Sequence, residues 1–161
     1  MKNLLLTSIA ILTFTFTMNA QGIADNAIGL RLGDSDGFGT EVNYQRALGE
    51  NNRLEIGLGW RSSNDVTAIK LAALYQWVWV LDGNFNWYVG AGGGIGQVDF
   101  DDDFPGDPDA ETFLFAAGDI GIEYDFDIPL LLSLDFRPEF GFGDYRDDVD
   151  FDIALGIRYQ F

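Results

Sequence analysis

The sequence contains no cysteine and no histidine in its 161 residues, and only nine lysines and arginines against 26 acidic residues. Without cysteine there is no disulfide framework, no thiolate chemistry and no lipidated cysteine. Without histidine the usual imidazole base and most zinc sites are excluded. The formal net charge of −17 argues against nucleic acid as a partner, because neutralising phosphates requires lysine and arginine.

The N-terminus differs in character from the rest of the chain. Lys2 precedes an apolar run over residues 4–16, and the small Ala20 follows. A charged start, a short apolar middle and a small residue at the cut are typical of a secretory signal peptide, which we predict over residues 1–20. A membrane-anchoring helix is the alternative, but about 15 apolar residues fall short of the roughly 20 that a span needs. The mature chain, residues 21–161, is then exported and suits one domain.

Beyond the signal peptide, apolar residues recur at every second position rather than at the helical period of 3.6. The last segment, FDIALGIRYQF, has Phe, Ile, Leu and Tyr on one face and Asp, Ala, Gly, Arg and Gln on the other. The same division recurs upstream, so we predict eight strands. They cover about residues 28–32, 38–48, 53–61, 68–81, 85–96, 114–126, 130–143 and 151–161.

The connections between these segments alternate in character. Gly49–Asn51, Asp82–Asn84 and Asp127–Pro129 have the composition of tight turns. An up-and-down meander therefore puts tight turns at one end and longer, acidic loops at the other. The longer loops cover residues 33–37, 62–65, 101–111 and 144–150.

Two all-β architectures fit a period of two. In a soluble sandwich or barrel the apolar face points inward, whereas in an outer-membrane barrel lipid lies outside and polar residues and glycine lie inside. About forty large apolar residues would overfill an eight-stranded barrel, whose interior side chains just fill. A sandwich holding the bulky faces between two sheets remains the soluble alternative. We predict an all-β fold, an eight-stranded antiparallel up-and-down transmembrane β-barrel.

The aromatic residues support this orientation, because they gather near the two ends of the predicted strands. The two membrane interfaces favour such bands, and a sandwich core has no reason to sort its aromatics by height. The interface aromatics are predicted to be Tyr44, Tyr75, Trp77, Trp79, Trp87, Tyr124 and Tyr159 at the tight-turn end, and Trp60 near the loops.

A barrel in hydrocarbon must also close, so that every backbone N–H and C=O is paired within the protein. The first and last strands are then expected to pair. Pro138 lacks an N–H, and a closed barrel offers no free edge. We expect a bulge at Pro138 or a position near the upper rim.

Charged residues of both signs fall on the predicted inner faces. Burying one such charge unpaired is costly, so we expect a salt-bridged network that fills the lumen. The alternative is a narrow pore along Gly90, Gly92, Gly94 and Gly96, unless these glycines make room for Arg137 or Arg158. The predicted lumen network consists of Arg31, Glu41, Arg53, Glu55, Arg61, Lys70, Asp119, Glu123, Asp135, Arg137, Glu139, Asp152 and Arg158.

The sequence bears on two further classes of site, a catalytic site and a metal site. An enzyme is disfavoured because serine lacks an evident base, although Asp135 with Asp152 could activate water. We expect no cofactor. Carboxylates are hard oxygen ligands, so the acidic loops are candidates for weak Ca²⁺ or Mg²⁺ binding. The EF-hand motif fails, because the position for its glutamate is Gln45. The loop carboxylates concerned are Asp34, Asp36, Asp101, Asp102, Asp103, Asp107 and Asp109.

The ending Gly156–Phe161, with Tyr159 and a terminal Phe161, resembles the small OmpA/OmpX-like outer-membrane β-barrel family. The resemblance implies a Gram-negative outer-membrane location and contact with lipid and lipopolysaccharide. It also implies that the barrel assembly machinery recognises the last strand, with Tyr159 and Phe161 as the signal. We expect a monomer with a structural or surface-interaction role, such as envelope integrity or adhesion, and fold implies activity only weakly.

Overall fold

The computed structural model describes residues 23–33, 40–62, 66–100, 110–142 and 148–161, and for Val66 and Phe100 the backbone alone. Among these residues there is no helix long and apolar enough to cross a membrane. The predicted signal peptide lies outside the described residues. The eight strands are β1 (Asn26–Leu32), β2 (Thr40–Ala47), β3 (Asn52–Ser62), β4 (Val66–Asp82), β5 (Phe85–Phe100), β6 (Glu111–Asp125), β7 (Leu130–Phe142) and β8 (Val149–Gln160).

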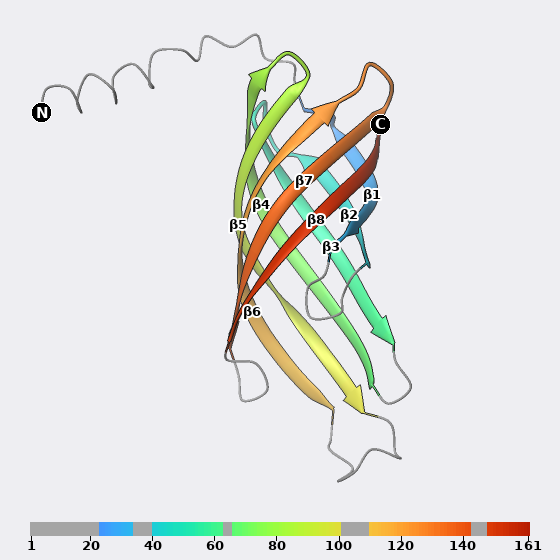
Figure 1. Cartoon of the computed structure of the whole chain (residues 1–161), viewed down its shortest axis with the longest axis vertical. Helices are drawn as coiled ribbons and strands as arrows, with labels where there is room; N and C mark the ends of the chain where they lie inside the picture. Colours follow the sequence, from blue (N-terminus) through green and yellow to red (C-terminus); the bar gives the residue numbers. More distant parts are fainter. Residues whose placement is uncertain (1–22, 34–39, 63–65, 101–109, 143–147) are drawn as a thin grey trace, which may run out of the picture.

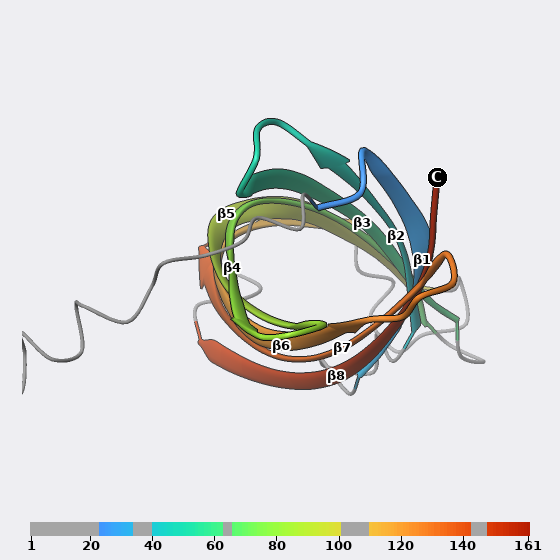
Figure 2. The same cartoon turned by 90° about the horizontal axis from the view of Figure 1, so that it is seen from above.

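The strands form one closed barrel in which each pairs with its neighbours in sequence order (Figures 1 and 2). All pairings are antiparallel, and β1 closes the barrel against β8, with Gly29 opposite Arg158. The predicted transmembrane barrel topology is confirmed, and the sandwich is excluded. Closure pairs the backbone of the first and last strands, as a protein in hydrocarbon requires.

The three predicted tight turns are confirmed, and they share one end of the barrel with the C-terminus (Figure 1). The turn between β4 and β5 contains Gly83 with a φ of 55°, a left-handed conformation that glycine adopts without steric cost. The strand ends that border the longer connections lie at the opposite end. The barrel is also uneven in height, because β4, β5 and β6 have 17, 16 and 15 residues whereas β1 and β2 have 7 and 8.

Of the two expectations for Pro138, the bulge is wrong and the position near the loop end of the barrel is confirmed. The β6–β7 ladder keeps one register on both sides of Pro138, from Ala117 opposite Glu139 to Ile120 opposite Phe136. Pro138 lies four residues before the loop end of β7. A Cβ built on Gly118 would lie 3.3 Å from Cγ of the proline ring, so a small residue opposite the ring accommodates it without an inserted residue. The register shift between β4 and β5 lies instead at Val80–Asp82, beside the turn.

The two faces of the sheet divide as the alternation predicts. Thirty large hydrophobic side chains of the described residues are exposed, among them Ile153 at 65% and Leu155 at 62% on the outer face. The buried residues in the described part of the chain are instead sixteen polar or charged ones and twelve hydrophobic ones. A water-soluble protein rarely exposes an apolar surface of this extent. The outside of the barrel therefore suits hydrocarbon.

Candidate functional site

The candidate site is the charged interior. Twelve of the thirteen residues predicted for the lumen network are buried, at 4% exposure or less. Arg61 is the exception, because it is exposed near the loop end of β3, beyond the last residue of β3 that pairs with β2, Gly59. Arg61 was predicted to lie in the lumen network, and this is corrected: its side chain is exposed, because β2 is too short to cover β3 at this height.

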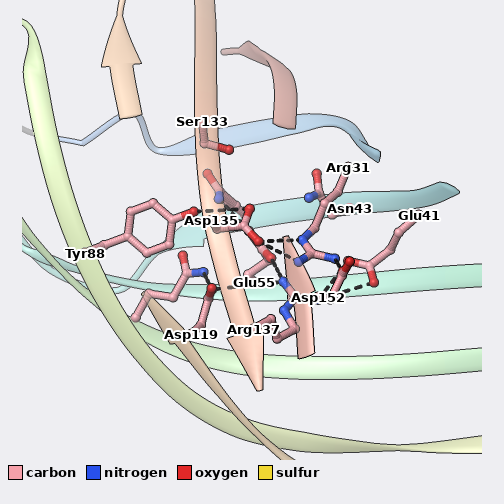
Figure 3. Close-up of polar contacts among 12 residues, drawn as sticks. Arg31, Glu41, Asn43, Glu55, Tyr88, Asp119, Ser133, Asp135, Arg137 and Asp152 are labelled. Atoms are coloured by element: carbon pink, nitrogen blue, oxygen red, sulfur yellow. Dashed lines mark hydrogen bonds and ion pairs between the residues drawn. The ribbon is translucent and has the colours of Figure 1, made fainter. Parts of the chain in front are cut away.

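Arg137 on β7 is the centre of this network (Figure 3). Its Nη1 donates hydrogen bonds to both carboxylate oxygens of Glu41 on β2, at 3.2 and 3.3 Å. Its Nη2 donates to Oε1 of Glu55 on β3 at 2.8 Å and lies 4.0 Å from Oδ2 of Asp119 on β6. Carboxylates from three strands thus surround one guanidinium in a space without bulk water, where such bonds are strong.

Arg31 on β1 binds two acidic residues that lie across the β1–β8 closure of the barrel. Its Nη1 donates to Oδ2 of Asp152 on β8 at 2.5 Å. Its Nε and Nη2 both donate to Oδ1 of Asp135 on β7, at 2.9 and 2.5 Å. Asp135 and Asp152, the pair considered for water activation, therefore share one arginine. This arrangement gives both carboxyl groups a structural role in the ion-pair network.

Arg158 on β8 connects the last strand to β2, β3 and β7. It donates to Glu55 at 3.1 Å, to the side-chain oxygen of Asn43 at 3.1 Å and to Oγ of Ser133 at 2.7 Å. A Cβ on Gly156 would lie 2.6 Å from Nη1 of this arginine. Glycine on the inner face therefore provides the room that the guanidinium occupies.

The tight-turn half of the lumen contains a further pair. Arg53 on β3 makes a two-pronged contact with Glu123 on β6, at 3.1 and 2.8 Å. Its Nε donates to Oε1 of Gln76 at 2.6 Å, and its guanidinium carbon lies 4.8 Å from the centre of the Tyr88 ring. Planar two-pronged pairing and stacking are geometries that arginine provides and lysine does not.

The loop half of the lumen contains an apolar cluster, which the sequence analysis above does not predict. Phe113 and Phe115 on β6 point inward and pack with Leu74 and Val98 in a buried cluster. Lys70 lies beside this cluster, 5.6 Å from the Phe115 ring, and donates to Glu139 at 2.9 and 3.2 Å. The signal was present in the sequence, because Phe113 and Phe115 continue the inner alternation of β6 from Ala117 toward the loop.

At Gly94 and Gly96 on β5, the structure shows neither the narrow pore nor the arginine contact that the sequence suggested. A Cβ at Gly94 would lie 2.8 Å from Cε1 of Phe115, and one at Gly96 would lie 2.5 Å from Cε1 of Phe113. These glycines therefore make room for phenylalanine rings rather than for a pore or for Arg137 or Arg158. The cavity at the tight-turn mouth, lined by Arg53 and Glu123 among others, has a volume of ≈ 10 Å³, which is room for one water molecule.

The described residues contain no group of three acidic side chains that could hold a metal ion. The carboxylates predicted for weak Ca²⁺ or Mg²⁺ binding lie outside the described residues: Asp34, Asp36, Asp101, Asp102, Asp103, Asp107 and Asp109. That expectation remains a prediction.

On the outer surface, none of the eight predicted interface aromatics is buried. At the tight-turn end Trp79 stacks on Trp87 across β4 and β5, with ring centres 4.7 Å apart. Tyr75 packs edge-on against Trp77 at 4.9 Å. Trp60, 50% exposed, lies near the opposite end of β3. Rings that gather at the strand ends match the headgroup regions of a bilayer.

The C-terminal residue is held at the closure of the barrel. The backbone N–H of Phe161 donates to the carbonyl oxygen of Asn26 at 2.9 Å, and the reverse bond measures 3.1 Å. The side chain of Asn26 donates to the same terminal carbonyl at 3.2 Å and accepts from Tyr44 Oη and Arg46 Nη1 at 2.6 and 2.7 Å. Asn26 therefore joins β1, β2 and the end of β8, a role that the sequence pattern did not indicate.

No protein-family model matches the chain, and no curated protein matches it. Solved structures do match. The N-terminal β-barrel domain of Pseudomonas aeruginosa OprF has a TM-score of 0.68 at 13% identity, covering 88% of this chain and 100% of that one. Neisserial surface protein A has a TM-score of 0.60 at 11% identity, covering 84% and 94%.

Ail, the attachment invasion locus protein of Yersinia pestis, has a TM-score of 0.57 at 16% identity, covering 87% of this chain and 99% of that one. A second Ail structure, in complex with the heparin analogue sucrose octasulfate, has a TM-score of 0.55 at 16% identity, covering 84% and 96%. These likenesses concern the fold. The chain has the fold of small eight-stranded outer-membrane β-barrels, consistent with the OmpA/OmpX-like family that its last strand resembles.

Proposed function

We propose that the protein is a sealed barrel of the Gram-negative outer membrane, with a structural and surface-interaction role in the envelope. In this role the barrel is an anchor, and contacts with other molecules are made by the loops. Export would depend on the predicted signal peptide over residues 1–20, and insertion on recognition of the last strand, with Tyr159 and Phe161, by the barrel assembly machinery.

The observation that carries this proposal is the filled lumen. Arg137, Arg31 and Arg158 connect carboxylates across the interior, and Phe113 and Phe115 occupy the loop half. A solute passing along the axis would have to break several buried ion pairs, each of which leaves an uncompensated charge. The arrangement therefore supports an anchor more than a narrow pore, and it provides no activated nucleophile for an enzyme.

The loops carry the charge that would select a partner. The segments 33–39, 63–65, 101–110 and 143–148 contain eleven aspartates and one arginine. This composition repels lipopolysaccharide phosphates unless Mg²⁺ or Ca²⁺ bridges the two, and it disfavours polyanions such as the heparin analogue found with Ail. We propose divalent-bridged lipopolysaccharide or cationic surfaces as the partners.

Two measurements test this function. Purified mature protein in planar bilayers should show no single-channel steps, and regular steps would contradict the anchor role. Binding of proteoliposomes to lipopolysaccharide vesicles should need Mg²⁺ and fall after EDTA. A variant with Asp101, Asp102 and Asp103 changed to asparagine should lose the Mg²⁺ dependence. Binding that is unchanged by EDTA and unchanged in this variant would refute the divalent bridge.

A further inference from the structure

The buried charges of the described interior do not balance. Seven carboxyl groups face five cationic side chains. Each unpaired buried charge is costly, so an excess of two negative charges requires compensation. The carboxyl groups are those of Glu41, Glu55, Asp119, Glu123, Asp135, Glu139 and Asp152, and the cations are Arg31, Arg53, Lys70, Arg137 and Arg158.

The ion pairs identify the carboxyl group with the weakest compensation. In the described interior, the other six carboxyl groups each lie within 3.2 Å of a cationic nitrogen. Asp119 lies 4.0 Å from Nη2 of Arg137, which is too long for a hydrogen bond. Arg137 directs its donors at Glu41 and Glu55 instead, and its Nε has no hydrogen-bond partner.

Gln76 determines which carboxyl oxygen of Asp119 has no hydrogen-bond partner. Oε1 of Gln76 accepts a hydrogen bond from Arg53, so its amide nitrogen must face the other way. That nitrogen donates to Oδ2 of Asp119 at 2.6 Å. Oδ1 of Asp119 is buried and has no hydrogen-bond partner. An ionised carboxylate would therefore keep one oxygen without any donor, in a residue only 4% exposed.

Groups on the other strands do not supply the missing charge. The charged groups that act on Asp119 are Arg137 and Asp135 on β7, Glu55 on β3 and Arg31 on β1. Tyr88 on β5 is the remaining titratable group that faces it. Two of the four charged groups are acids, and both arginines already hold shorter pairs. The field around Asp119 therefore offers little attraction for a second negative charge.

We propose that the lumen contains a proton-binding site at Asp119, whose carboxyl group is neutral in the folded barrel and carries its proton on Oδ1. A proton fits this site better than a metal ion does, because the described residues contain no group of three acidic side chains arranged to hold a metal ion. The bound proton removes one of the two excess negative charges. Raising the pH until Asp119 ionises should then weaken the barrel.

The test is infrared spectroscopy of the full mature protein in lipid at neutral pH. Exposed carboxyl groups are ionised there, so a C=O stretching band of a protonated acid reports a buried one. The wild type should show this band, and D119N should lose it while still folding, because asparagine imitates the neutral acid in shape. The matched control is E123Q, which removes a carboxylate that Arg53 pairs with, and should retain the band.

Stability provides the second readout. The midpoint of thermal unfolding should fall as the pH is raised in the wild type, and should fall less in D119N. Absence of the band from the wild type, or its persistence in D119N, would overturn the proposal. A wild-type midpoint that depends on Na⁺ at constant ionic strength and is independent of Na⁺ in D119N would assign the site to a metal cation, which also overturns it.

Discussion

Replacing Arg137 by methionine should be among the most damaging single changes in this barrel. The side chain is 1% exposed and holds Glu55 at 2.8 Å and Glu41 at 3.2 Å, with Asp119 at 4.0 Å. Methionine keeps much of the side-chain bulk but removes the charge, so Glu41 loses the cation that it pairs with and Glu55 keeps only Arg158. Breaking a buried pair from one side costs about 3–5 kcal/mol.

A gross Coulomb estimate shows why the net loss is not larger. One pair of unit charges at 4 Å is worth about 4 kcal/mol at an effective dielectric constant near 20, and the desolvation of both ions opposes it. A loss of about 3–5 kcal/mol is still a large fraction of the roughly 5–15 kcal/mol that holds an ordinary domain folded. R137M is therefore expected to fold poorly or to unfold at much lower denaturant.

The assay is urea unfolding of the mature protein in detergent micelles, followed by tryptophan fluorescence and by gel mobility without heating. The midpoint should fall without a change of slope. Arg46 is the control, because it is exposed and its contact with Asn26 is a surface contact, so R46M should lose under about 1 kcal/mol. Equal losses for R137M and R46M would refute the reasoning that the lumen network is buried and mutually dependent.

Three further predictions concern the walls of the barrel. G96V should prevent folding, because its Cβ collides with the Phe113 ring. In the control G49A, the added Cβ meets only one atom, at 3.9 Å, so its stability should be within about 0.5 kcal/mol of the wild type. Refolding yield on gels measures both variants, and equal yields would contradict the packing of Phe113 against Gly96. L155R puts a charge on the lipid face and should destabilise the barrel by about 2–4 kcal/mol in urea unfolding, while an unchanged midpoint would mean that this face meets water. N26A removes three side-chain hydrogen bonds at the closure and should lose about 1–2 kcal/mol, and faster amide exchange at Phe161 should accompany the loss.

Much of the fold follows from the sequence, because alternation of period two assigns each residue to a face whatever the register. The eight strands, the three tight turns and the closure of first on last strand were all predictable. The bulk of the apolar face also decided its orientation, since an eight-stranded interior cannot hold it. Twelve of the thirteen residues predicted for the lumen are buried for this reason.

What the sequence could not supply is which inner residues meet. Arg31 reaches Asp135 and Asp152 across 104 and 121 positions of the chain, and only the closed sheet with its stagger between strands places them together. The unequal heights of the strands exposed Arg61 in the same way. The glycines of β5 were visible as a pattern, yet the rings that Gly94 and Gly96 accommodate, Phe115 and Phe113, lie on another strand.

The sequence by itself therefore determined the architecture, the faces and the composition of the interior. The tertiary structure alone decided the pairing of charges, the position of the apolar cluster and the isolation of Asp119. The physical reason is that the alternation is a property of each strand taken separately, whereas an ion pair depends on the distance between strands. That distance is set by the register of all eight ladders together.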